Sequence, residues 1–490
     1  MSKAVVIGGG FGGIAAALRM RAKGYQVTLI DRCDELGGRA QVFKRNGFTF
    51  DAGPTVITAP YLFNELFDLF DKDLTDYINF VPVEPWYRFA YPDGSTFDYG
   101  GTLEDTLLEI EKISPVDVLG YKKLLAVSEK IFDVGFTGLA DKPFHSVWTM
   151  IKQIPHLARL RCYRSVYQLV SQHLKHDKLR QAFTIQPLLV GGNPFDTTSI
   201  YNLIHFLERK WGIHYAMGGT GQVVKGLHQL MVEQGIEIQL NTTAESFVLD
   251  GKHIQGIRLA DGKVLECDKV VSNMDPTFLY DKVIEKRHQP LLTKLKTRHA
   301  KLSMGLYVLY FGTNKTFNDV PHHTIWLGKR YRELLDDIFN KKVLADDFSL
   351  YLHRPTATDP SMAPDGCDCF YVLSPVPNLQ SGLEWDDIRD AYREKILTAL
   401  DQTIMPGLKD SVIEQFDMTP KEFKQDYLST AGSGFSIAPV LRQSAWFRYH
   451  NKGEGLDNLY LVGAGTHPGA GLPGVLSSAK VLEHLVPDVG

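Results

Sequence analysis

Residues 4–31 read AVVIGGGFGGIAAALRMRAKGYQVTLID, and this stretch decides the fold. Its first four residues form an apolar run that suits a buried parallel strand. The glycine motif G-x-G-x-x-G follows at Gly8, Gly10 and Gly13. Gly8 permits a tight turn, Gly10 lets the backbone approach a pyrophosphate, and Gly13 lets the following helix pack close to the strand.

The helix and strand predicted after the glycine motif complete the pattern. Residues 14–20 are good helix formers, and the amide groups at the start of such a helix attract an anion. A second apolar strand is predicted at 26–30, and Asp31 at its end is placed to accept a hydrogen bond from an adenosine ribose. This order of elements predicts an α/β fold with a dinucleotide-binding site.

Further glycine-rich segments favour FAD over NAD as the dinucleotide. Gly37, Gly38 and Arg39 follow the acidic strand end, where they can reach the far end of a longer cofactor. Near the C-terminus, a strand at 458–462 leads into a Gly-rich loop and a final helix at 475–485, which brings a second helix N-terminus to the ligand. The residues expected to contact FAD are Gly8, Gly10, Phe11, Gly12, Gly13, Asp31, Arg32, Gly37, Gly38, Arg39, Gly53, Pro54, Thr55, Gly463, Ala464, Gly465, Gly474 and Val475.

The composition is that of a globular protein. Of the 490 residues, 44% are hydrophobic and 22% are charged, which excludes a wholly disordered or fibrous chain. The formal net charge of −4 argues against nucleic-acid binding through global charge, and we expect no nucleic-acid partner. The 5 cysteines are sparse and odd in number, so we expect reduced thiols and no disulfide framework.

The sequence gives only weak signals for a metal site. Cys367 and Cys369 are the one close cysteine pair, whereas zinc sites usually need two well-spaced pairs. His322 and His323 are adjacent, but two neighbouring histidines rarely share an ion without further ligands. We therefore expect no metal.

A basic segment at 152–180 is the main sign of a membrane-facing region. Its basic side chains outnumber the single acid, Asp177, and are interleaved with Tyr, Leu and Val. This mixture fits an interfacial element on anionic lipid, although an amphipathic helix packed on the core has the same pattern. No stretch resembles a span of about 20 apolar residues, and Met-Ser-Lys leads directly into a strand pattern, so we expect neither a transmembrane helix nor a signal peptide.

Several longer motifs extend over the chain. They are VIGGGFGG at 6–13, GGRA at 37–40, GFTFDAGPTVI at 47–57, LLVGGNPF at 188–195, SIY at 199–201, GGTG at 218–221, QSAWFR at 443–448 and LVGAGTHPGAGLPG at 461–474. Together these motifs resemble the bacterial and fungal type of phytoene desaturase, a carotenoid desaturase family within the flavin-dependent amine-oxidase-like superfamily, and the resemblance covers essentially the whole chain. The C-terminal loop is the most specific motif, because Gly-Thr-His-Pro-Gly is unlike the matching loop of most superfamily members, and Ala464-Gly465-Thr466 stands where many of them have an acidic residue.

The resemblance implies a Rossmann-like FAD-binding domain of the amine-oxidase type, a mixed-sheet substrate domain and a helical membrane-facing region. It divides the chain into FAD-binding parts at 1–85, 215–285 and 456–490, a helical substrate region at 86–214 and a substrate-binding part at 286–455. It also implies FAD-dependent desaturation of 15-cis-phytoene, a C40 polyene precursor, to lycopene or an intermediate such as neurosporene. The expected partners are the polyene, oxygen or a quinone as electron acceptor, and a lipid surface, with the protein in the cytoplasm and attached peripherally to the inner face of the cell membrane.

The catalytic side chains stay open at this point. The implied mechanism is hydride transfer to flavin followed by loss of a proton, and the sequence names no proton acceptor. His467 is a weak candidate, because a hydrogen bond that holds its loop in shape explains it more simply. The alternatives are a redox-neutral carotenoid isomerase, a C30 diapophytoene desaturase, an isoprenoid carrier without flavin, and an amine oxidase acting on a soluble substrate.

Overall fold

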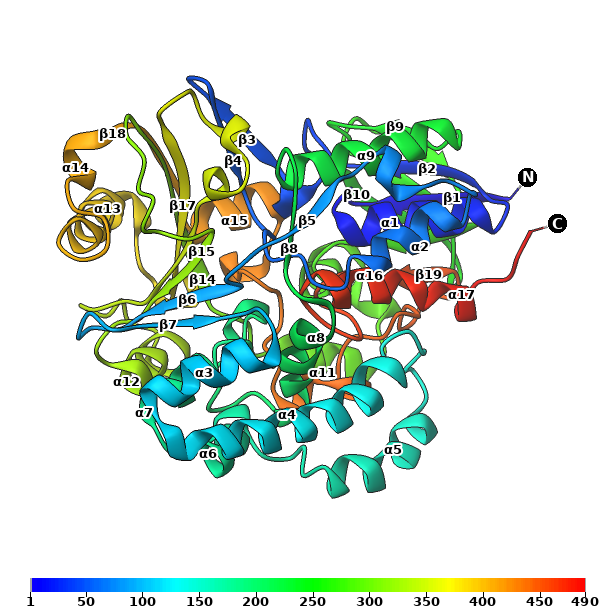
Figure 1. Cartoon of the computed structure of the whole chain (residues 1–490). Helices are drawn as coiled ribbons and strands as arrows, with labels where there is room; N and C mark the ends of the chain where they lie inside the picture. The colour runs from blue at the N-terminus through cyan, green and yellow to red at the C-terminus, as the bar shows by residue number, and fades with distance from the viewer. Residues whose placement is uncertain (1, 490) are drawn as a thin grey trace.

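A five-stranded parallel sheet contains the strand before the glycine motif. The computed structural model describes residues 2–489. The strand order is β19 (Leu459–Leu461), β13 (Lys269–Ser272), β1 (Lys3–Ile7), β2 (Gln26–Ile30) and β9 (Glu237–Gln239), and all neighbouring pairs are parallel. Segments from both ends and from the middle of the sequence therefore share one sheet (Figure 1). This sheet and the helices that cover it confirm the predicted α/β class.

Helix α1 (Phe11–Ala22) lies between this sheet and a second layer of helices. Every residue from its start to Met20 is buried, because β1 and β2 contact one side and α16 (Leu472–Lys480), α9 (Thr220–Glu233) and α2 (Tyr61–Asp68) contact the others. A helix that is apolar all round is typical of such a fully buried position. The side chains of α1 thus fix the distance between the glycine motif and the C-terminal helix.

The C-terminal helix differs in extent from its prediction at 475–485. α16 begins earlier, at Leu472, and a break at Val481 separates it from α17 (Leu482–Leu485). Pro473 explains the earlier start, since proline is tolerated in the first turn of a helix, where its missing N–H would have no partner.

A small antiparallel sheet lies in the middle third of the chain. Its strands are β10 (Ala244–Asp250), β11 (His253–Leu259) and β12 (Val264–Glu266). Asp-Gly turns separate these strands, and both turn glycines adopt positive φ angles, 61° at Gly251 and 86° at Gly262, which glycine reaches without steric cost.

A seven-stranded mixed sheet forms the second large layer. Within β14, Leu306 and Val308 face a cavity, whereas Tyr307 and Leu309 pack in the core beneath α13 (Trp385–Asp401). β14 therefore has one face toward the cavity and the other in the core. The strand order is β18 (Val412–Met418), β14 (Gly305–Thr313), β17 (Asp368–Val376), β16 (Leu350–His353), β15 (His323–Trp326), β6 (Tyr87–Ala90) and β7 (Thr96–Tyr99), with β15 and β6 parallel and the other pairs antiparallel.

The helical region lies along one side of the molecule, and α5 (Val147–Arg159) sits at its outer edge (Figure 1). No residue of α5 is buried, whereas α6 (Val166–His173) and α7 (Asp177–Ala182) bury apolar side chains in the core. The basic segment at 152–180 is therefore not one interfacial element, because its second half is held by core packing. The other helices of this region are α3 (Leu103–Ile113), α4 (Val118–Phe132) and α8 (Leu203–Trp211).

Across residues 2–489, no helix is both long enough and apolar enough to cross a membrane. The 5 cysteines are free thiols, as predicted. The predicted division of the chain into parts at residues 85, 214, 285 and 455 stays a prediction.

The remaining elements connect these layers. They are β3 (Val42–Arg45), β4 (Phe48–Asp51), β5 (Phe80–Pro82), β8 (His214–Ala216), α10 (Pro276–Phe278), α11 (Leu291–Arg298), α12 (Tyr331–Asp336), α14 (Leu408–Ser411) and α15 (Pro420–Tyr427).

Candidate cofactor and substrate site

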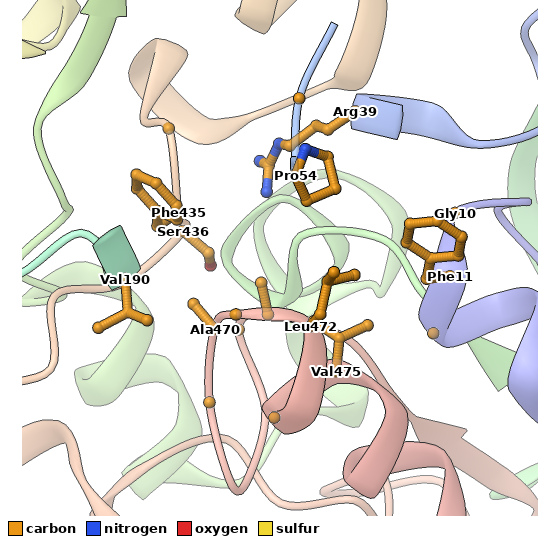
Figure 2. Close-up of a pocket in the computed structure, with 18 of the residues that line it drawn as sticks. Gly10, Phe11, Arg39, Pro54, Val190, Phe435, Ser436, Ala470, Leu472 and Val475 are labelled. Carbon is orange, nitrogen blue, oxygen red and sulfur yellow. The ribbon is translucent and has the colours of Figure 1, made fainter. Parts of the chain in front are cut away.

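A cavity of about 530 Å³ extends from the glycine motif to the helical region. In Figure 2, Arg39 and Pro54 face Leu472 and Val475 across it, with Phe11 toward one end. Of the 18 residues expected to contact the cofactor, all but Gly13 and Gly463 line this cavity. The structure thus gathers segments from the two ends of the sequence around one space, while their contact with FAD stays a prediction.

The glycine motif forms a turn with no room for side chains. A Cβ atom on Gly12 would lie 2.6 Å from Oδ1 of Asn273, and one on Gly10 would lie 3.0 Å from its Nδ2. A Cβ on Gly13 would lie only 1.8 Å from the carbonyl oxygen of Gly8, so α1 packs directly on the turn. This geometry fits the close approach of a diphosphate to the backbone.

Asn273 is a site residue that the sequence prediction missed. It directly follows β13, the strand beside β1, and its Nδ2 donates to the carbonyl of Gly8 at 3.4 Å. It also lies against Gly463, where a Cβ would come within 2.3 Å of its Oδ1. The sequence position of Asn273, directly after a predicted strand, could have indicated its role, because residues at the carboxyl ends of parallel strands form the ligand crevice.

Asp31 holds the first turn and the end of β2 together. It is 7% exposed, and its carboxylate accepts hydrogen bonds from the backbone amides of Gly9 and Cys33. The next residue, Arg32, donates to the carbonyl of Asp426 at 3.1 Å, which ties the strand end to the last turn of α15. Asp31 and Arg32 both line the cavity, and the ribose contact of Asp31 stays a prediction.

Arg39 brings a half-buried positive charge to the cavity. Its Nη2 donates to the hydroxyl of Ser429, whereas its Nε has no hydrogen-bond partner within residues 2–489. Burial lowers the pKa of this guanidinium, so an anionic or carbonyl acceptor in the cavity would stabilise it. Gly53 permits the approach of this segment, because a Cβ there would lie 1.9 Å from the carbonyl oxygen of Arg39.

The C-terminal Gly-rich loop is held by Arg448, a second residue that sequence reasoning missed. Its guanidinium is buried and donates to the carbonyls of Thr466 at 2.8 Å and Ala464 at 2.6 Å. Arg448 is the last residue of the QSAWFR motif, which was recognised from the sequence without a role being assigned to this side chain. Its two hydrogen bonds fix the loop backbone, which runs along the cavity to the N-terminus of α16.

His467 also lines the cavity, but its side chain contacts the helical region. Its Nε2 hydrogen-bonds the carbonyl of Leu139 at 2.9 Å, and its ring packs on Phe144. Burial lowers its pKa to about 4, so the ring is neutral near pH 7. These contacts describe a side chain that ties the loop to the helical region, and a catalytic role for it stays a prediction.

The far part of the cavity is an apolar arm. It is lined by residues of strand β14 and of the helical region, including Leu157 of α5. We call this part the apolar arm and define it by Leu139, Ala140, Phe144, Leu157, Ile185, Leu188, Leu189, Ile200, Leu203, Ile204, Leu207, Met304, Leu306 and Val308. An arm with these side chains suits a hydrocarbon.

Glu208 lies among the residues of the apolar arm, and within residues 2–489 it is the one carboxylic acid that does so. It is 1% exposed, and its oxygens accept hydrogen bonds from Tyr87 at 3.1 Å and Gln186 at 3.3 Å. Burial raises its pKa to about 7, although both hydrogen bonds act in the opposite direction. The sequence signal was its place on the apolar face of α8, four residues after Ile204 and one after Leu207.

Comparison with known proteins gives concordant results. The family described as flavin containing amine oxidoreductase matches residues 11–481. A lycopene-forming phytoene desaturase from Pseudescherichia vulneris is 46% identical over 489 residues, which is 99% of each chain. A neurosporene-forming phytoene desaturase from Rhodobacter capsulatus is 43% identical over 495 residues, covering 100% of this chain and 94% of its own. The crystal structure of an oxidoreductase from Methanosarcina mazei has the same fold, with a TM-score of 0.65, 15% identity and coverage of 98% and 100%.

Proposed function

This chain belongs to the flavin-containing amine oxidoreductases, and we propose that within this family it is an FAD-dependent phytoene desaturase. The observation that carries the proposal is the cavity, in which a dinucleotide turn and a long apolar arm form one continuous space. The two similar desaturases, matched over nearly their full lengths, support a C40 polyene as the substrate. Lycopene or an intermediate such as neurosporene is the product.

The residues of the cavity fit FAD as the cofactor. The turn at Gly10 and Gly12 accommodates a diphosphate, Asp31 lies at the ribose position, and the buried Nε of Arg39 can donate to an oxygen of the cofactor. When bound, FAD supplies a hydride acceptor, so the protein has to orient the polyene and exclude water. The apolar arm performs both tasks, because its side chains fix the depth of a hydrocarbon and shield it from solvent.

We further propose that Glu208 accepts the proton that leaves the substrate. Removal of a hydride leaves positive charge on the polyene, and loss of a proton from the adjacent carbon completes the double bond. A carboxylate beside the apolar arm is placed to receive that proton. Its pKa of about 7 is close to the value at which a general base combines availability with basicity near neutral pH.

The substrate also favours peripheral attachment to a membrane. Exposing about 40 apolar carbons to water would cost on the order of 30 kcal/mol, so the polyene has to pass directly from a bilayer into the cavity. α5 lies where that transfer would occur, since Leu157 reaches the apolar arm while Trp148 is 69% and Ile154 is 50% exposed. Basic residues on and after α5, among them Lys152 and Arg159, would meet anionic headgroups.

Replacing Trp148 and Ile151 together by Ser is expected to lower partitioning onto anionic liposomes by about 10- to 100-fold. The reason is the loss of two apolar side chains from the lipid contact: each contributes about 1.5–3 kcal/mol at full burial, so burying both about halfway contributes about 1.5–3 kcal/mol in total. Sedimentation with liposomes measures the change, and flavin content should not alter because both side chains are exposed. The matched control is Leu108→Ser with Leu119→Ser on α3 and α4, and equal partitioning of the two double variants would contradict this orientation.

The proposed reaction itself is tested on purified protein with FAD and phytoene-containing liposomes. New visible absorption bands with three maxima are expected, and their positions count the double bonds formed. Without oxygen the flavin should bleach, and oxygen or an added quinone should restore its colour if either is the electron acceptor. Flavin binding without new bands would favour an isomerase or a C30 desaturase, absence of flavin would favour a carrier, and peroxide release with amines would favour an amine oxidase.

A further inference from the structure

Three histidines lie together behind the wall of the cavity. His323 in β15 and His353 in β16 are directly paired across the two strands, and His322 precedes β15. Their ring centroids are 4.5 Å (His322–His323), 4.9 Å (His322–His353) and 5.5 Å (His323–His353) apart. All three are buried, with exposed fractions of 3% or less.

Two of the three rings use one nitrogen in a hydrogen bond. Nδ1 of His322 hydrogen-bonds Thr358 at 2.6 Å and Nδ1 of His323 hydrogen-bonds Tyr351 at 2.8 Å, whereas Nε2 of His353 only approaches Oδ2 of Asp51, at 3.5 Å. Nε2 of His322, Nε2 of His323 and both ring nitrogens of His353 have no hydrogen-bond partner within residues 2–489. Buried polar atoms normally have partners, so four of them in one cluster require an explanation.

The three rings lie close enough together to share one metal ion. One possible ligand atom from each histidine lies within 4.8 Å of the other two. In a tetrahedral zinc site, with Zn–N bonds of about 2 Å, the ligand nitrogens are about 3.3 Å apart, so the three rings would have to close by up to about 1.5 Å around the ion.

The surroundings complete the pattern expected of such a site. Metal-bound imidazoles usually offer their second nitrogen to a carboxylate, hydroxyl or carbonyl, which is the role that Tyr351 and Thr358 have here, and the carboxylate of Asp51 lies 3.5 Å from Nε2 of His353. The nearby guanidinium of Arg354 is paired with Asp368 at 2.9 Å, and this pairing reduces its repulsion of a cation.

We propose that His322, His323 and His353 bind one Zn²⁺ ion, a site separate from the cofactor and substrate contacts. Three imidazoles suit zinc, and the ion would join the loop before β15 to β16. Binding through Nε2 leaves the proton of His323 on Nδ1, so this nitrogen donates to the hydroxyl of Tyr351. That hydroxyl then donates to Thr55, 2.9 Å away, and so the ion would set the hydrogen-bond direction in the cavity wall.

The sequence prediction of no metal rested on two adjacent histidines without further ligands. The strand pairing of His323 with His353 supplies the third ligand, 30 positions further along the chain. Because the cluster is buried, the ion has to be acquired during folding, and loading has to be tested on protein expressed with the metal present.

The test is metal analysis of the full chain, purified without a histidine tag from cells grown with added zinc. About one zinc per chain is expected, and His353→Ala should reduce it at least tenfold. His205→Ala is the matched control, because His205 is equally buried but lies beside Tyr99 outside the cluster, and it should keep the zinc. Fewer than about 0.1 zinc per flavin-loaded wild-type chain, or equal zinc in wild type and His353→Ala, would overturn the proposal.

A second measurement keeps the test decisive if the alanine variants do not fold. Wild-type protein expressed with cobalt in place of zinc should show the intense visible bands of four-coordinate Co²⁺, read after the flavin is bleached. Absence of these bands in folded, flavin-loaded protein grown with cobalt would contradict the site. Neither result depends on phytoene turnover, so failure of this proposal is separate from failure of the proposed function.

Discussion

Replacing Glu208 by Gln is expected to lower the rate of phytoene desaturation by a factor on the order of 10²–10⁴, the usual contribution of a general base. Glutamine keeps the shape of the side chain and can keep the hydrogen bond from Tyr87, but it cannot accept a proton at neutral pH. Binding of the polyene and of FAD should change little, because the substitution leaves the apolar arm and the glycine motif intact. The loss should therefore appear in the rate of anaerobic flavin reduction and not in the flavin content.

The pH dependence gives an independent check of the role of Glu208. Only the carboxylate is a base, so wild-type activity should rise as the pH increases through about 7, the raised pKa of this group. In Glu208→Gln this ascending limb should be absent. Glu129→Gln, on the exposed face of α4, is the matched control and should keep both the rate and the profile.

Stability measurements separate catalysis from folding in this experiment. The folded-state pKa of Glu208 is raised above its ordinary value of 4.5, so the protonated side chain favours folding and this contribution is lost as pH rises through about 7. At pH 8 the buried carboxylate costs about 3 kcal/mol relative to a neutral group. Glu208→Gln should therefore melt at the same or a higher temperature than wild type at pH 8, and an inactive variant that melts lower would point to misfolding instead. Activity within threefold of wild type would assign the proton to another acceptor.

The cofactor half of the site was predictable from sequence because its constraints are local. A Cβ at Gly13 would meet the backbone of Gly8, and a Cβ at Gly53 would meet the backbone of Arg39. Both clashes are with backbone atoms nearby in the sequence, so these positions require glycine whatever side chains surround them. The spacing of glycines therefore reveals the turn. The same reasoning located the C-terminal loop, although Pro473 moved the start of its helix.

The remaining site residues were not predictable because their roles come from contacts over long sequence distances. Glu208 matters through the apolar arm, which strands and helices from several parts of the chain build together. Arg448 matters through carbonyls of a loop that lies next to it only after folding. His353 joins His323 through strand pairing, and sequence spacing alone does not give the register of two strands.

Gly13→Ala is expected to weaken FAD binding by about 100-fold or more. The new Cβ would lie 1.8 Å from the carbonyl oxygen of Gly8 and 3.0 Å from its carbonyl carbon, and neither backbone atom can move independently of β1. α1 must therefore shift away from the turn, which draws its N-terminal amides away from the pyrophosphate. A 100-fold loss corresponds to about 2.7 kcal/mol, within the usual cost of overpacking a closely packed site.

Titration of the apoprotein with FAD, followed by quenching of flavin fluorescence, measures this loss. Ala17→Gly in the same helix is the control, since it lowers helix stability by about 1 kcal/mol without pushing α1 from the turn. If both variants lose affinity equally, general destabilisation of α1 is the cause and the close contact at Gly13 is not. If only Gly13→Ala loses affinity, the distance between helix and turn sets the strength of cofactor binding. The same helix packs on α16, so a shift of α1 would also move the C-terminal loop. The desaturation rate of Gly13→Ala should therefore stay below that of wild type even when FAD is added to saturation.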